Sequence, residues 1–196
     1  VKGRNLKKLG LKGQDTSEMS FSDCRVPVEN LLGTEGRGFK MLMEKLQQER
    51  LCIGIASIAS CRRSLQDTLD YVKERTAFGQ PIGAFQAVKH RCADMLVDVE
   101  GMRSTAYHAA WSIGAGDPDA SVAAAVAKIW CSDAGLRVAE SALQVHGAIG
   151  FTWESDVHLY LKRIQLDQVS FGDAEHHRTR LGETLRQRVG DGTPIL

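Results

Sequence analysis

Apolar residues recur at helical spacing over most of this chain. Phe39, Leu42 and Leu46 begin one such pattern, which continues to about Leu69. Residues three and four apart lie on one face of a helix, so the pattern predicts a long amphipathic helix. A second helix is predicted over about 84–113, because Val88, Cys92 and Met95 begin a similar apolar pattern and no proline interrupts that stretch.

Three further helices are predicted in the second half of the chain. Asp117-Pro118-Asp119 supplies capping carboxylates and a proline suited to a first turn, and an alanine-rich helix follows to about Gln144. A break at Gly147-Ala148-Ile149-Gly150 separates it from helices at about 156–168 and 176–189. Helices of this length joined by short loops predict a mainly α fold, an antiparallel four-helix bundle.

The first thirty or so residues follow a different pattern. Glycines separate short stretches in which Met19 and Phe21 alternate with polar residues, which predicts strands and turns from the edge of a β domain. Two or three short strands need a hydrophobic partner surface to be stable. We therefore expect residues 1–33 to be the end of a middle β domain and residues 34–196 to be the helical domain. We also expect the rest of the β domain to lie outside this chain, which begins with Val1.

Composition argues against several classes of protein. The chain has 25 Lys and Arg against 24 Asp and Glu, so it lacks the basic field that nucleic-acid binding requires. No apolar run approaches the roughly 18 residues of a membrane span. The five cysteines form no CxxC pair, which argues against a metal site or a disulfide framework and favours buried free thiols. We expect a cytoplasmic protein that binds neither nucleic acid nor a metal.

Two loops carry residues suited to a cofactor. In the first, Arg75, Phe78 and Gln86 offer a guanidinium, an aromatic ring and an amide between two helices. Arg can bind a pyrophosphate through its planar set of donors, although a solvated helix-terminal Arg and a Phe in the core fit the residues as well. In the second, Gln144 and Gly147 follow the third helix. A glycine there either lets the backbone approach a ligand or ends the helix.

In this order, the two loops resemble those of the carboxyl-terminal half of the flavin-dependent acyl-CoA dehydrogenases. The resemblance extends from Lys7 to about Arg186 and includes stretches 26–33 and 36–39. It implies a helical domain that forms a homodimer or homotetramer, with FAD lying across a subunit boundary. It also implies contacts to the FAD of the neighbouring subunit, near its pyrophosphate and adenosine, from Arg75, Phe78, Gln86, Gln144 and Gly147. Ala148 stands where the family usually has a second glycine.

The resemblance also raises the question of the catalytic base. The family removes the proton alpha to a thioester carbonyl with a carboxylate, while the flavin takes a hydride from the beta carbon and trans-2-enoyl-CoA forms. Its common pattern near the carboxyl end is Tyr-Glu-Gly, with Arg six places after the Gly. Here Ser170-Phe171-Gly172 and Arg178 align with that pattern. Phe171 cannot accept a proton.

A second arrangement in the family places the catalytic glutamate at another position. Isovaleryl-CoA and long-chain acyl-CoA dehydrogenases carry the glutamate on the first long helix of the bundle, and Gln47-Gln48-Glu49-Arg50-Leu51 matches that position. The resemblance therefore implies Glu49 as the base and Arg50 as a residue that shapes the substrate site. From the residues alone, a solvated helix carboxylate is the alternative for Glu49.

The leading hypothesis is an FAD-dependent acyl-CoA dehydrogenase that passes electrons to an electron-transfer flavoprotein, with acyl length and branching left open. A non-catalytic partner subunit that completes the FAD site of a heteromer is a second hypothesis. The loss of the usual glutamate favours it, and the presence of Glu49 opposes it. A third is a relative that acts as a flavin monooxygenase or nitroalkane oxidase, which the acidic residue at a dehydrogenase position disfavours.

Overall fold

The computed structural model describes residues 1–194 and has two compact units, Val1–Met41 and Leu42–Leu196. The first holds two short strands, and the second holds the helical bundle. The predicted fold class, a mainly α bundle preceded by a short β segment, is confirmed. The predicted domain boundary after Gly33 stays a prediction.

The amino-terminal unit is a two-stranded antiparallel ribbon. Strand β1 (Lys2–Asn5) pairs with β2 (Ser17–Met19), and Lys2 lies opposite Met19. A short 3-10 helix, η1 (Val28–Asn30), follows. Almost every side chain in this ribbon is exposed, so the two strands bury no core of their own. A ribbon of this kind needs a partner surface to be stable.

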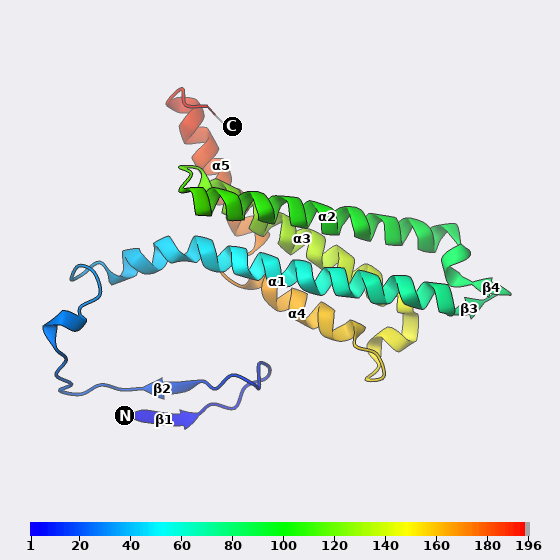
Figure 1. The fold of residues 1–196 in the computed structure, drawn as a ribbon, viewed down its shortest axis with the longest axis horizontal. Helices are drawn as coiled ribbons and strands as arrows, with labels where there is room; N and C mark the ends of the chain where they lie inside the picture. Colours follow the sequence, from blue (N-terminus) through cyan, green and yellow to red (C-terminus); the bar gives the residue numbers. More distant parts are fainter. Residues whose placement is uncertain (195–196) are drawn as a thin grey trace. The chain divides into compact units, whose positions relative to one another are not determined.

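The helical unit contains the five helices that the sequence predicted. They are α1 (Gly38–Glu74), α2 (Gln86–Ala115), α3 (Ala120–His146), α4 (Val157–Val169) and α5 (Ala174–Gly190). The connections contain β3 (Thr76–Ala77), β4 (Gln80–Pro81), η2 (Ile82–Ala84) and η3 (Gly147–Phe151). The long helices α1, α2 and α3 run alongside one another, and α4 lies beside α1 and α3 (Figure 1).

The core of the bundle is built around α3. Small side chains on this helix, including Ala134 and Ala142, are fully buried and let its neighbours approach closely. The main apolar cluster draws residues from four helices, among them Leu65 of α1, Met102 of α2 and Ile164 of α4. A second cluster, formed by Leu51, Ala106, Ala109, Ala123 and Ala127, lies nearer the α2–α3 turn.

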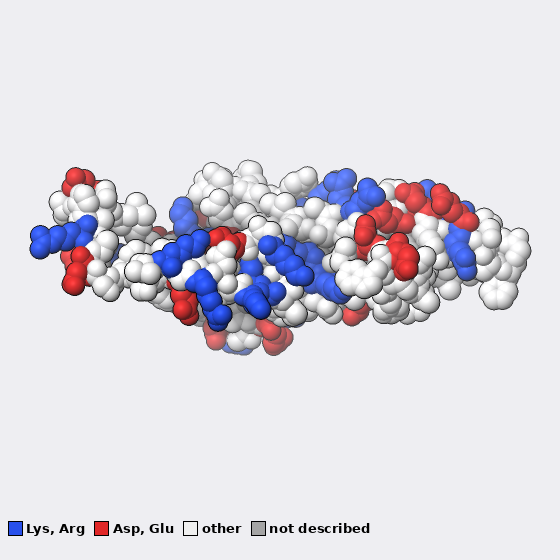
Figure 2. All heavy atoms as spheres, turned by 90° about the horizontal axis from the view of Figure 1, so that it is seen from below, with Lys and Arg blue, Asp and Glu red and all other residues white. Residues whose placement is uncertain are grey.

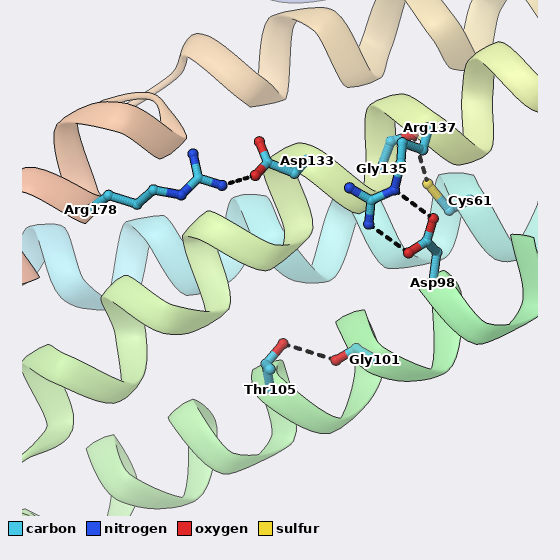
Figure 3. A network of polar contacts seen from close by, with 8 residues as sticks. All are labelled: Cys61, Asp98, Gly101, Thr105, Asp133, Gly135, Arg137 and Arg178. Carbon is cyan, nitrogen blue, oxygen red and sulfur yellow. Dashed lines mark hydrogen bonds and ion pairs between the residues drawn. The ribbon is translucent and has the colours of Figure 1, made fainter. Parts of the chain in front are cut away.

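Polar contacts also connect α3 to its neighbours (Figure 3). Arg137 forms a two-pronged ion pair with Asp98 of α2, at 2.6 and 2.9 Å. Arg178 of α5 forms an ion pair with Asp133. These pairs are partly exposed, so each stabilises the fold modestly.

Two expectations about local packing need correction. Asp119 does not cap α3 with its side chain, because its carboxylate forms an ion pair with Arg188 of α5. The carboxylate of Asp117 instead accepts a hydrogen bond from the Asp119 main-chain N–H, at 2.8 Å. Three of the cysteines are buried free thiols, as expected, whereas Cys24 and Cys52 are exposed.

Candidate functional site

The loop between α1 and α2 is a tight β-hairpin. Ala77 lies opposite Gln80, so Phe78 and Gly79 form a two-residue turn. Both residues have positive φ, +52° and +83°. A turn of this kind requires that conformation at both positions, which glycine adopts freely and an aromatic residue adopts only under strain. The Phe78 side chain is 95% exposed, which excludes the alternative of a Phe packed in the core.

The two polar residues of this loop lie on either side of the hairpin. The main-chain N–H of Arg75 donates to Tyr71 O at 2.9 Å, and its carbonyl accepts from the Ile82 N–H at 2.8 Å. The backbone is thereby held while the exposed Arg75 side chain is free to bind a ligand. Gln86 is the first residue of α2 and is also exposed.

The second predicted cofactor loop begins where α3 ends. Gly147 has φ +63° and ψ −140°, a conformation that side chains disfavour, and its N–H bonds to carbonyls of the last turn of α3. A Cβ at this position would meet nothing within 4 Å. The backbone at Gly147 therefore faces open space that a ligand can enter. Gln144 lies one turn earlier and is exposed.

A stacked pair of rings joins the two loops. The rings of Tyr71 and His146 lie 4.4 Å apart at 20°, and Tyr71 Oη donates to the His146 carbonyl at 3.5 Å. Tyr71 lies one turn before Arg75, and His146 precedes Gly147. The predicted cofactor residues of both loops therefore lie at the same end of the bundle (Figure 1).

The predicted base lies on α1, far from these loops. Glu49 is exposed, and its carboxylate forms no hydrogen bond or ion pair within residues 1–194. Arg75 follows the last residue of α1, so about 39 Å of helix separates it from Glu49. One chain therefore presents the predicted base and the predicted FAD contacts at two separate places.

The next residue, Arg50, contacts the turn between α4 and α5. Arg50 Nε donates to the Phe171 carbonyl oxygen at 3.2 Å, and His177 Nε2 lies 3.1 Å from the same oxygen. Phe171 and Gly172 both have positive φ, +57° and +94°. Arg50, the residue after the predicted base, thus links this turn of α1 to the α4–α5 turn, where Phe171 aligns with the family's more common base position.

The electrostatics of this region favour a bound anion. Burial and the nearby Arg180 guanidinium lower the pKa of Arg50, against the opposing charge of Glu49. Arg180 forms no ion pair with any of residues 1–194, so two cations lie close together without enough acidic partners. Burial lowers the pKa of His177 to about 4, so this imidazole is neutral near pH 7 and its Nε2–H donates to Phe171.

A cleft of about 230 Å³ opens beside Arg50. Its walls come from α1, the start of α3 and α5, and include Gln47, Ser121, His177 and Arg180. The first turn of α3 adds the partial positive charge of a helix N-terminus. The cleft can therefore hold a negatively charged or strongly polar group.

Comparison with known proteins identifies the family. The acyl-CoA dehydrogenase C-terminal domain matches residues 36–186. The chain belongs to the acyl-CoA dehydrogenase family. That family binds FAD. The chain is 37% identical to the mitochondrial long-chain specific acyl-CoA dehydrogenase of Mus musculus, over 79% of this chain and 36% of the mouse protein.

Solved structures of related proteins have the same fold as this chain. Butyryl-CoA dehydrogenase from Megasphaera elsdenii has a TM-score of 0.87 and 33% identity, covering 95% of this chain and 48% of that one. A chain in the structure of the electron transferring flavoprotein of Acidaminococcus fermentans has a TM-score of 0.85 and 35% identity, covering 94% and 48%. The acyl-CoA dehydrogenase domain described here thus spans about half the length of these relatives.

Two general features bear on partners and ligands. No helix within residues 1–194 is long and apolar enough to cross a membrane, and the same range holds no cluster of His, Cys, Asp or Glu suited to a metal ion. Acidic and basic side chains both appear on the face in Figure 2. The near-neutral net charge of +1 agrees with this mixture.

Sequence reasoning missed several residues around the site. Tyr71, His177 and Arg180 contact or line it but carry no local pattern that distinguishes them. Lys128 carried a usable signal, because it is a lone cation in the apolar, alanine-rich stretch of α3. It is 2% exposed and lies against the end of α4.

Proposed function

We propose that this chain is the carboxyl-terminal part of an FAD-dependent acyl-CoA dehydrogenase and acts within a larger chain or assembly. The observation that carries the proposal is the contact of Arg50 with Phe171 at 3.2 Å. Arg50 follows Glu49 and contacts the α4–α5 turn, in which Phe171 aligns with the family's more common base position. The family membership supplies the reaction class, and the contact supports a base at Glu49.

The residues of the two loops fit FAD. Arg75 offers a guanidinium for the pyrophosphate, and the exposed ring of Phe78 offers a surface on which a nucleotide base can stack. Gly147 leaves its backbone open to a ligand, and Gln86 and Gln144 supply amides. FAD, once bound, supplies the redox chemistry by accepting a hydride.

The 39 Å between the two regions supports an oligomer. Because the base and the FAD contacts lie about 39 Å apart along α1, we propose that they serve different flavins. A second copy then supplies Arg75 and its neighbours to the flavin beside Glu49. This arrangement requires a homodimer or homotetramer, or a heteromer of closely related chains.

Glu49 has the properties that proton abstraction needs. It is exposed on α1, and no hydrogen bond or ion pair within residues 1–194 holds its carboxylate. It is thus free to accept the proton alpha to the thioester carbonyl. Arg50 is fixed by the Phe171 carbonyl and keeps this turn of α1 against the α4–α5 turn.

The family membership supplies the substrate class, and the charges near the proposed base are compatible with a polar substrate. Arg50 and Arg180 line a cleft that suits a negatively charged or strongly polar group. We therefore propose that Arg50 contributes to substrate binding. Electrons would pass on to an electron-transfer flavoprotein, which the similarity to a chain in such a structure supports.

A non-catalytic partner subunit is the second candidate. Phe171 favours it, because this residue occupies the common base position and cannot accept a proton. Such a subunit would still supply Arg75 and Phe78 to the FAD of its partner. The two candidates differ in whether this chain reduces a flavin beside its own Glu49.

The experiment uses the FAD-loaded holoenzyme, in which this chain is joined with the rest of the site. Acyl-CoAs of varied length and branching are added without oxygen, the bleaching of flavin absorbance is followed, and the product is identified. Bleaching with formation of a 2-enoyl-CoA is the expected result. Bound FAD that no acyl-CoA bleaches would reject the dehydrogenase in favour of the partner subunit, and an oxygenated product would indicate a monooxygenase.

A further inference from the structure

Lys128 is a buried cation whose hydrogen bonds are all made within the bundle. It lies on α3 and is 2% exposed. Its ammonium group donates to Ser132 Oγ at 2.9 Å, Asp167 O at 2.8 Å and Gln168 O at 2.9 Å. An ammonium group has three hydrogens, so every donor has an acceptor. Burying a cation costs free energy, and a satisfied set of this kind limits that cost.

Two of these acceptors lie in the last turn of α4. The final carbonyls of a helix have no partner within the helix, and a lysine is well suited to bind them because the helix C-terminus carries partial negative charge. The buried carboxylate of Asp167 adds a negative charge to the same turn. It accepts a hydrogen bond from Ser57 Oγ at 3.1 Å and forms an ion pair with Arg163 at 2.9 Å. The last turn of α4 is therefore held from α1, α3 and α4 itself.

The segment after that turn reaches the proposed base within a few residues. α4 ends at Val169, and Ser170 donates its N–H to Leu166 O at 3.1 Å. The next carbonyl, that of Phe171, accepts from Arg50 Nε at 3.2 Å. Arg50 is the residue after Glu49. The backbone of residues 167–171 thus connects the hydrogen bonds of Lys128 in the core to the hydrogen bond of Arg50.

We propose that Lys128 is a positioning residue, which acts through the α4–α5 turn and Arg50 to hold Glu49 in its reactive place. This inference rests on the proposed function, because it requires Glu49 to be the base. The Lys128 side chain belongs neither to the two cofactor loops nor to the lining of the cleft. The pKa of Lys128, lowered to about 8 chiefly by burial, agrees with a cation held away from water.

The test compares Lys128→Met with native holoenzyme by two measurements. Amide hydrogen exchange at Ser170 reports whether the end of α4 is held, and flavin bleaching at saturating acyl-CoA reports the chemical step. We expect Ser170 to exchange at least roughly tenfold faster and bleaching to slow by roughly 10- to 100-fold, because small displacements at a reacting site cost this much. Substrate affinity should change less than the bleaching rate.

Matched variants separate positioning from general stability. Arg137→Met also removes a long cation from α3, but it breaks the pair with Asp98 on the side facing α2. It should leave Ser170 exchange and the bleaching rate near native values, measured at the same folded fraction. Lys128→Arg keeps the charge and the donors, and should recover part of the bleaching rate. If Lys128→Met does not fold, Lys128→Gln replaces it. We expect the same faster Ser170 exchange and the same slower bleaching in Lys128→Gln, with smaller changes in both.

The outcomes are distinguishable. Faster Ser170 exchange with a native bleaching rate overturns the inference and leaves Glu49 in its proposed role. Unchanged Ser170 exchange in Lys128→Met, or in Lys128→Gln where that variant is used, overturns it as well. An equal slowing of bleaching in Arg137→Met would reduce Lys128 to a stabilising residue. Failure of the proposed function itself appears elsewhere, as a native bleaching rate in Glu49→Gln.

Discussion

The guanidinium of Arg50 lies 3.2 Å from the main-chain oxygen of Phe171, although 121 positions separate the two residues in the chain. The contact joins the turn of α1 that carries Glu49 to the α4–α5 turn, in which Phe171 aligns with the other position expected for the family's glutamate. We propose that the two turns border one substrate pocket. Either position can serve a single pocket, provided that a carboxyl oxygen reaches the alpha proton.

This relationship predicts that the base can be moved. Glu49→Gln/Phe171→Glu holoenzyme should regain part of the flavin bleaching that Glu49→Gln loses, since the new carboxylate would enter the same pocket from the α4–α5 turn. We expect recovery to within roughly 10- to 1,000-fold of the native rate, because small displacements of a base are costly. Stopped-flow absorbance with one acyl-CoA measures it. No recovery, in a double variant that folds and binds FAD, would show that position 171 does not face the reacting carbon.

The hairpin turn predicts a conflict between stability and FAD binding. Phe78 has φ +52°, so Phe78→Asn should relieve strain and stabilise the protein by about 1 kcal/mol. The same change removes the exposed ring, and FAD affinity should fall roughly tenfold. Gly79→Asn is the control, because asparagine tolerates this conformation and the ring is retained. A Phe78→Asn holoenzyme that binds FAD as tightly as native would remove Phe78 from the proposed contacts.

Two glycines on α2 should respond to alanine with opposite signs. A Cβ at Gly101 would lie 2.5 Å from Trp130 Nε1, so Gly101→Ala should destabilise the protein by roughly 1–3 kcal/mol through overpacking. A Cβ at Gly114 would meet nothing within 4 Å, and Gly114→Ala should stabilise by about 0.5–1 kcal/mol. Urea unfolding of both variants measures the difference. Equal stability of the two would contradict the close packing of Trp130 on α2.

His177 predicts a loss of stability in mild acid. Burial lowers its pKa to about 4 in the folded protein, below the usual value of 6.5. The unfolded chain therefore binds this proton first as pH falls. The free energy of unfolding that depends on neutral His177 is therefore fully present above about pH 6.5 and is lost as the pH falls toward 4. We expect a cost of roughly 2 kcal/mol, less than the full shift implies, because His177 lines a cleft that water enters.

Unfolding measurements across this pH range provide the check. His177→Gln should flatten the dependence of unfolding free energy on pH between 4 and 6.5. His176→Gln, a change at the exposed neighbour, should keep the native slope. The same slope in the His177 variant as in the native protein would assign the acid sensitivity to other groups.

Much of the fold was predictable because periodicity reports burial directly. The helical spacing from Phe39 to Leu69 and the alanine-rich stretch after Pro118 both correspond to observed helices, α1 and α3. The role of Asp119 was predicted incorrectly. Its distant partner Arg188 competes successfully with the local backbone for the carboxylate, and a local capping pattern contains no information about that partner.

The site was predictable only in part. The two cofactor loops carried local signals, and both lie at one end of the bundle (Figure 1). The contact of Arg50 with Phe171 and the neutral His177 depend on how α1 packs against α5, which no single stretch encodes. Trp111 and Trp153 carry large rings of a kind that is usually well buried, yet they are 63% and 82% exposed. Trp111 lies on an exposed face of α2, and Trp153 lies in the turn between η3 and α4.

One comparison of flavin-bleaching rates tests whether Glu49 is the catalytic base. Native holoenzyme and Glu49→Gln are mixed anaerobically with the acyl-CoA that bleaches the native flavin fastest, and the bleaching rate is recorded. Glu140→Gln, a change at an exposed glutamate on α3, serves as the control. A base at Glu49 predicts a rate roughly 10²- to 10⁴-fold lower in Glu49→Gln, with FAD still bound, and a native rate in the control. Equal bleaching by Glu49→Gln and native holoenzyme would contradict it.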